Sequence, residues 1–239
     1  MNRDRALDLL YPPHCPICEK YIYQKRGTDR IALVCPSCAQ KIARVGDRFC
    51  LKCGKPVASA QEEFCADCRR RGHAFAQGRS VFVYRDGIRD SLCRFKYENK
   101  KEYARFYAAA MAAALGGWIR AQQIDCIMPV PLHEKRQRQR GYNQAELIAL
   151  RLGEQLGIPV ETDILVRTRA TLPQKGLSGE QRRRNMEGVF ALRAQPREGL
   201  TVLLVDDIYT TGTTMDAAAA VLLRAGAGAV YAACAATGG

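Results

Sequence analysis

The sequence of 239 residues predicts an α/β protein with a mainly parallel sheet and helices on both faces, preceded by a small cysteine-rich module. Eight of the eleven cysteines form four Cys-x-x-Cys pairs before residue 70. From residue 79 onward, apolar segments of strand length alternate with segments of helical periodicity. Such alternation is typical of a parallel sheet covered on both faces. We therefore expect two domains, at residues 1–73 and 74–239.

The cysteine pairs predict metal binding. They are Cys15 and Cys18, Cys35 and Cys38, Cys50 and Cys53, and Cys65 and Cys68. Each pair offers two thiolates to one ion, and two pairs complete a tetrahedral Cys₄ site. We expect two structural Zn²⁺ ions, because a closed Cys₄ site leaves no position for a substrate. Sequential pairing would give two zinc ribbons in tandem, and a cross-braced arrangement is the alternative. Four regularly spaced pairs disfavour redox-active dithiols.

The sequence also indicates the cellular compartment of the protein. Residues 1–10 carry four charged side chains and no sustained apolar stretch, which argues against a secretory signal. The longest apolar run, at residues 106–119, is too short and too rich in alanine to span a bilayer. Together with thiols that are expected to bind zinc, these features predict a cytoplasmic protein.

The second domain is predicted to begin after a boundary at residues 72–78. Its strands are expected at residues 80–84, 126–130, 201–206 and 229–235. Its helices are expected at residues 88–97, 102–122, 143–155 and 213–225. Between the second strand and the third helix we expect a basic loop.

The predicted strand at residues 201–206 ends in two adjacent acidic residues. It delivers Asp206 and Asp207 to the carboxyl edge of the sheet, where open α/β sheets bind ligands. Two adjacent carboxylates can accept hydrogen bonds from the two vicinal hydroxyls of a ribose. An acidic strand end also occurs in nucleoside triphosphatases, but their Gly-x-x-x-x-Gly-Lys-[Ser/Thr] motif is absent from this sequence.

A threonine-rich segment follows the two acids and leads into a predicted helix. This threonine loop consists of Thr210, Thr211, Gly212, Thr213 and Thr214. Its hydroxyls and backbone N–H groups, together with the helix N-terminus, are suited to a phosphate dianion. The sequence therefore predicts a ribose 5-phosphate site, with the sugar on the acids and the phosphate on the threonine loop.

The formal net charge of +13 favours polyanionic ligands such as nucleic acid or pyrophosphate. Two Zn²⁺ ions on eight thiolates would lower it to about +9, because ligating cysteines are deprotonated. A solvated basic surface is the plain alternative.

The acids and the threonine loop resemble the signature of the type I phosphoribosyltransferases. The whole chain is similar to the ComF family, competence-associated phosphoribosyltransferase-like proteins with an N-terminal double zinc ribbon. Besides the cysteine pairs and the acidic signature, the resemblance lies in residues 95–97, 129–132, 140–145 and 174–178. Lys175 departs from the common family form, in which this position holds a smaller residue.

This resemblance implies a type I phosphoribosyltransferase-like sheet and a site for phosphoribosyl pyrophosphate with Mg²⁺. In related transferases the turn after the first core strand contacts the pyrophosphate. The corresponding candidates are Lys135, Arg136 and Arg140, and Lys96 is a further one. Negative charge builds on the leaving pyrophosphate when its bond to the sugar breaks, and cations with Mg²⁺ would stabilise it.

The resemblance further implies a role in handling single-stranded DNA during natural transformation, alongside other DNA-uptake proteins. The alternative is an active transferase that moves ribose 5-phosphate to a base or amine. The sequence identifies neither the catalytic residues nor the acceptor.

A second basic cluster, at residues 182–184, follows a segment at residues 176–179 that could be a lid. Either basic cluster could instead follow a nucleic-acid backbone.

Overall fold

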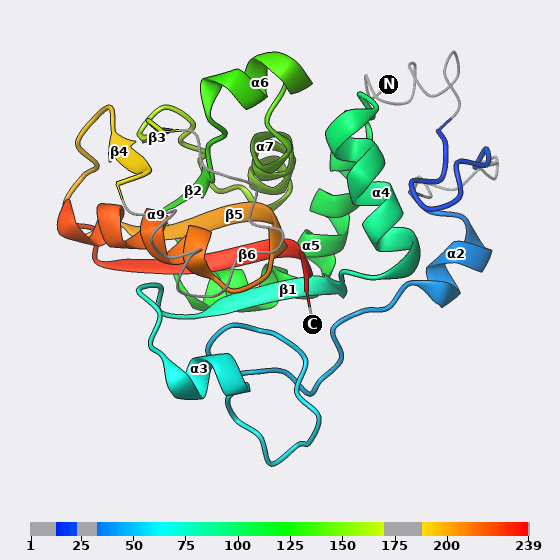
Figure 1. The fold of residues 1–239 in the computed structure, drawn as a ribbon, viewed down its shortest axis with the longest axis horizontal. Coiled ribbons are helices and arrows are strands. Elements are labelled where there is room, and N and C mark those ends of the chain that lie inside the picture. The colour runs from blue at the N-terminus through cyan, green and yellow to red at the C-terminus, as the bar shows by residue number, and fades with distance from the viewer. Residues whose placement is uncertain (1–12, 23–32, 170–187, 239) are drawn as a thin grey trace.

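A computed structural model describes residues 13–22, 33–169 and 188–238 (Figure 1). The helices are α2 (Pro36–Lys41), α3 (Ala66–Arg70), α4 (Asp86–Tyr97), α5 (Tyr103–Ala121), α6 (Glu134–Arg140), α7 (Gln144–Leu156) and α9 (Thr213–Arg224). The strands are β1 (Gly78–Val83), β2 (Cys126–Pro129), β3 (Leu165–Arg167), β4 (Phe190–Leu192), β5 (Thr201–Tyr209) and β6 (Ala229–Thr237).

The main sheet has the strand order β1-β6-β5-β2, and every neighbouring pair is parallel. Successive side chains of a strand point to opposite faces. Accordingly, Leu203 and Val205 of β5 join the core formed with α5 and α7. Val202 and Leu204 join the second core, formed with α9. The predicted parallel sheet with helices on both faces is confirmed.

The basic segment after β2 is a helix, where we predicted a loop. Helix α6 follows His133, whose ring Nδ1 accepts the backbone N–H of Lys135 at 3.2 Å, and it ends at Gly141 with φ +77°. None of its residues is buried. The long polar side chains of this segment favour a helix. The segment lacks the apolar stripe by which a helix is recognised in a sequence, and the prediction was therefore wrong.

Strand β5 extends beyond its predicted end, because Ile208 and Tyr209 continue the pairing with β6. Asp206 and Asp207 therefore lie inside the strand, and their side chains leave it on opposite faces.

The antiparallel pair of β3 and β4 was not predicted, since three-residue strands are too short to show a hydrophobic pattern.

The two cysteine-rich parts pack against the sheet domain at separate places (Figure 1). The first lies beside α4, where Arg94 donates hydrogen bonds of 2.9 Å to the carbonyl oxygens of Pro16 and Ile17. The second lies at the start of β1, where the N–H of Gly78 donates to the carbonyl oxygen of Lys52 at 2.7 Å.

Three predicted features fall outside the described residues: the motif at 174–178, the lid at 176–179 and the basic cluster at 182–184. In the described part of the chain, no helix combines the length and the apolar character needed to cross a bilayer.

Candidate functional site

The cysteine sulfurs form two groups in sequence order. The groups are Cys15, Cys18, Cys35 and Cys38, and Cys50, Cys53, Cys65 and Cys68, each with its ligand atoms within 4.8 Å of one another. Cys18 Sγ and Cys35 Sγ are 3.7 Å apart. Cys53 Sγ and Cys65 Sγ are also 3.7 Å apart. A tetrahedron with Zn–S bonds of about 2.3 Å has edges of about 3.8 Å, so both groups fit Zn²⁺. Sequential pairing is confirmed, and cross-bracing is not observed in either described group.

Replacing ligands in pairs should reveal this grouping in zinc content. We expect two Zn²⁺ ions per chain, and Cys15→Ser with Cys35→Ser should remove one, because both residues serve the same site. Cys15→Ser with Cys50→Ser should remove both. Elemental analysis of the two double variants checks this, and the reverse pattern would show that the sites are cross-braced.

Asp207 lies against a cation in the candidate sugar site. Its carboxylate Oδ2 is 2.6 Å from Nζ of Lys96, the penultimate residue of α4. The side chains are only 11% and 18% exposed, so each charge depends on the other for compensation. The structure thus brings Lys96, predicted to contact pyrophosphate, to Asp207 of β5. Its contact with pyrophosphate stays a prediction.

Asp206 has a different environment on the other face of β5. Its Oδ1 accepts the backbone N–H of Asp207 at 2.8 Å. Burial, and next the negative charge of Asp207, raise the pKa of Asp206 above its usual range, while Lys96 opposes this. Asp206 therefore binds a proton more readily than an ordinary carboxylate. In the protonated form it can donate a hydrogen bond as well as accept one.

Arg167 of β3 is a site residue that the sequence did not reveal. Burial, and next the positive charge of Arg136, lower the pKa of Arg167, whereas the charge of Asp206 raises it. These effects place α6, β3 and the acidic strand end within electrostatic reach of one another. The hairpin that carries Arg167 was not predicted, and no local pattern could have indicated this neighbour.

Another α6 cation reaches the same region from the helix end. Arg140 donates hydrogen bonds to Gln144 Oε1 at 3.0 Å and to the Tyr97 hydroxyl at 3.3 Å. Its guanidinium also lies 5.0 Å from the centroid of the Tyr97 ring. Arg140 thus contacts the residue that follows Lys96 in the sequence. Lys135 is exposed on α6.

The threonine loop turns sharply between β5 and α9. Gly212 has φ +78° and precedes α9 as its N-cap residue. The hydroxyls of Thr211 and Thr213 are 2.8 Å apart. The hollow that the loop encloses with the end of β5 is only about 10 Å³, room for one water molecule. A phosphate would therefore bind over the outside of the loop and the helix N-terminus, which favours anions.

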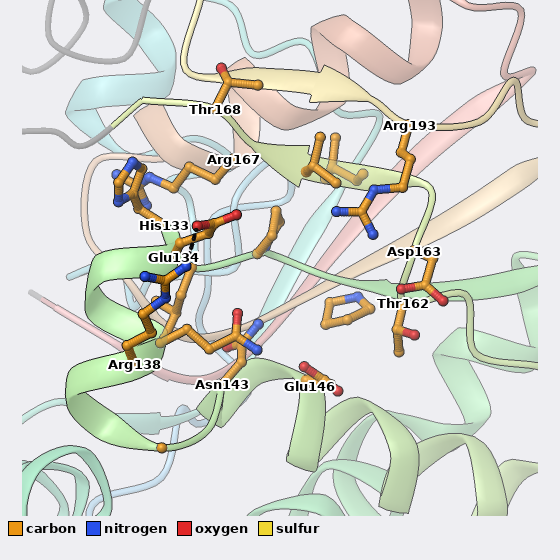
Figure 2. A pocket seen from close by; sticks show the side chains of 17 residues that line it. His133, Glu134, Arg138, Asn143, Glu146, Thr162, Asp163, Arg167, Thr168 and Arg193 are labelled. Atoms are coloured by element: carbon orange, nitrogen blue, oxygen red, sulfur yellow. Dashed lines mark hydrogen bonds and ion pairs between the residues drawn. The ribbon is translucent and has the colours of Figure 1, made fainter.

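A larger pocket of about 960 Å³ lies between α6, the start of α7 and β3 (Figure 2). Figure 2 shows arginines from three segments around it, with Asn143, the N-cap residue of α7, and Glu146 of α7 on another side. Burial, and next the charge of Asp163, raise the pKa of Glu146. The pocket includes Pro129, which pairs with Val205, the residue before Asp206.

Family models match two parts of the chain. The double zinc ribbon domain matches residues 6–69, and the phosphoribosyl transferase domain matches residues 138–239. Because neither covers residues 70–137, the domain boundary between residues 73 and 74 stays a prediction.

Three curated relatives show what the chain is similar to. Competence protein F of Haemophilus influenzae is 37% identical over 138 residues, which are 56% of this chain and 60% of that protein. Competence protein ComFC of Bacillus subtilis is 29% identical over 150 residues, 63% and 59% of the two chains. DNA utilization protein YhgH of Escherichia coli K12 is 40% identical over 110 residues, 46% and 48% of the two chains. The matches therefore span about half to three fifths of these relatives.

Among solved structures, a purine phosphoribosyltransferase from Pyrococcus horikoshii overlaps with 55% of this chain and 74% of its own, at 18% identity and a TM-score of 0.37. The chain thus combines a double zinc ribbon domain and a phosphoribosyl transferase domain with similarity to competence proteins, in agreement with the resemblance of the whole chain to the ComF family.

Proposed function

We propose that the protein binds phosphoribosyl pyrophosphate at the carboxyl edge of β5 and acts in the handling of single-stranded DNA during natural transformation. One observation carries the first half of this proposal. The acids of β5, the ion pair of Asp207 with Lys96, the threonine loop and the cations of α6 converge at one edge of the sheet.

The convergence suggests a place for each part of the ligand. The ribose hydroxyls would bind Asp206 and Asp207, and the 5-phosphate would bind the threonine loop. The pyrophosphate would lie toward α6, where Arg136 acts electrostatically on Arg167, Arg140 contacts Tyr97 and Lys135 adds charge. Pyrophosphate would also offer Lys96 an alternative partner to Asp207.

Mg²⁺ would accompany the pyrophosphate in this proposal. Among the described residues, only the two cysteine groups bring three or more potential ligand atoms within 4.8 Å. Mg²⁺ is commonly held by one or two carboxylates together with substrate phosphates, a pattern that Asp206 or Asp207 can complete. The ion would neutralise charge on the leaving pyrophosphate.

The second half of the proposal concerns DNA. Its support is the names of the relatives, two competence proteins and a DNA utilization protein. The structure adds α6, which carries four cations, buries none of its residues and stands out beyond β2 (Figure 1). A helix of this kind can follow a phosphate backbone without being needed for the core.

Salt dependence tests the DNA half. Replacing the exposed cations Lys135 and Arg138 with Ala should flatten the slope of log affinity for single-stranded DNA against log salt by about 1.4, or about 0.7 per lost phosphate contact. The matched control replaces Arg85 and Arg89 of the α4 region, which are also exposed. Fluorescence anisotropy with a labelled oligonucleotide measures both slopes. No binding at about 50 mM salt would contradict the role in DNA handling.

The pocket of about 960 Å³ favours a second candidate, an active phosphoribosyltransferase. An acceptor base or amine could enter there, beside the acidic strand end. The test is incubation with labelled phosphoribosyl pyrophosphate, Mg²⁺ and a panel of acceptors that includes single-stranded DNA. Release of pyrophosphate that depends on one acceptor would establish transfer, and its absence with every acceptor would leave binding alone.

A further inference from the structure

The segment that joins the second zinc site to β1 contacts the threonine loop. We call residues 71–75 the linker segment. The guanidinium of Arg71 donates a hydrogen bond to the carbonyl oxygen of Thr211, in the middle of the loop. The backbone N–H of Ala74 donates to Asp216 Oδ1 at 3.0 Å, in the first turn of α9.

One buried imidazole ties together the two ends of the loop. His73 has a side-chain exposure of 0%, and its Nδ1 lies 2.8 Å from Asp216 Oδ2. Its Nε2 lies 3.5 Å from the hydroxyl of Tyr209, the last residue of β5. Because the Asp216 carboxylate accepts, we assign the ring proton to Nδ1, which leaves Nε2 to accept from Tyr209.

The linker segment also fills the space next to the turn. A Cβ added to Gly212 would lie 2.9 Å from Cε1 of His73 and 2.4 Å from the hydroxyl of Tyr209. The turn is therefore packed directly against the imidazole and cannot move toward it.

The other end of the linker segment is anchored on the second zinc site. Phe75 stacks on His73 with ring centroids 4.7 Å apart, and it belongs to the same core as Cys50 and Cys53. Nζ of Lys52, which lies between those two cysteines, donates to the carbonyl oxygen of Ala76 at 3.0 Å. Filling a Cys₄ site fixes the backbone around its ligands.

From these contacts we infer that the linker segment is a positioning element for the threonine loop, and that it couples phosphate binding there to the filling of the second zinc site. The inference rests on the proposed function, in which this loop receives the 5-phosphate. Coupling between two binding sites is reciprocal, so bound sugar phosphate should strengthen zinc binding by the same factor.

Two alanine variants test the inference. In calorimetry with Mg²⁺, Arg71→Ala and His73→Ala should each raise the Kd of phosphoribosyl pyrophosphate about tenfold, while the zinc content stays at two per chain. His73→Asn, which can keep an N–H toward Asp216, should recover most of the loss. The matched control is Arg70→Ala, since that neighbouring guanidinium is 75% exposed and pairs with Asp67 at 3.1 Å. The Kd of phosphoribosyl pyrophosphate for Arg70→Ala should equal that of the wild type.

Hydrogen exchange of the unliganded protein provides a readout that needs no ligand. Amides at residues 209–216 should exchange faster in Arg71→Ala and His73→Ala than in the wild type or Arg70→Ala. Wild-type exchange in both variants would overturn the inference, and so would faster exchange without loss of affinity. If the wild type fails to bind phosphoribosyl pyrophosphate but the exchange result holds, the proposed function is wrong and the positioning role remains.

Discussion

Replacing Asp206 and Asp207 together with Asn is expected to weaken the binding of phosphoribosyl pyrophosphate at least about a hundredfold. The reason is that hydrogen bonds to charged groups each contribute about 1.5–3 kcal/mol. Losing two of them corresponds to at least about 3 kcal/mol, or two orders of magnitude in Kd. Isothermal titration calorimetry in the presence of Mg²⁺ measures the change, and an unaltered Kd would remove the sugar site from β5.

The ion pair of Asp207 requires a control for stability. Asp207→Asn leaves Lys96 without its charged partner at 18% exposure, so we expect a loss of about 3 kcal/mol in unfolding free energy. Adding Lys96→Met should restore much of the stability, because both charges are then gone, without restoring the affinity. Asp90→Asn, in an exposed pair on α4, should change neither quantity. Chemical denaturation with calorimetry separates a folding defect from a binding defect.

Gly212→Ala is expected to have the second largest effect, because two penalties act at one position. The backbone has φ +78°, a conformation that costs a residue with Cβ about 1–2 kcal/mol. In addition, the new methyl would lie 2.4 Å from the Tyr209 hydroxyl, so the threonine loop must shift. We expect the affinity for phosphoribosyl pyrophosphate to fall at least about a hundredfold, as measured by calorimetry.

Gly157→Ala is the matched control for this variant. Gly157 ends α7 with φ +70°, but a Cβ there would meet no atom within 4 Å. It therefore carries the backbone penalty alone and should lower stability without lowering affinity. If both glycine variants bind as well as the wild type, the position of the threonine loop does not matter for binding.

The sequence alone was sufficient where chemistry is encoded in adjacent residues. The eight zinc ligands could be identified because a Cys-x-x-Cys pair brings two sulfurs together within one turn of backbone. The threonine loop could be identified in the same way, since the two acids, the glycine and the threonines are contiguous. Alternation of strands and helices was likewise enough to predict the parallel sheet.

Only the tertiary structure decided how these parts meet. Pairing of the cysteine groups, the contact of Lys96 with Asp207 and the electrostatic effect of Asp206 on Arg167 all join residues distant in the chain. The same holds for His73, which reaches Tyr209 and Asp216 from the far side of the domain boundary that we predicted. Such contacts depend on how helices and strands pack, which local periodicity does not encode. The sequence therefore identified the groups that we propose to bind zinc and phosphate, whereas packing determined which charged side chains lie against them and which segment contacts the threonine loop.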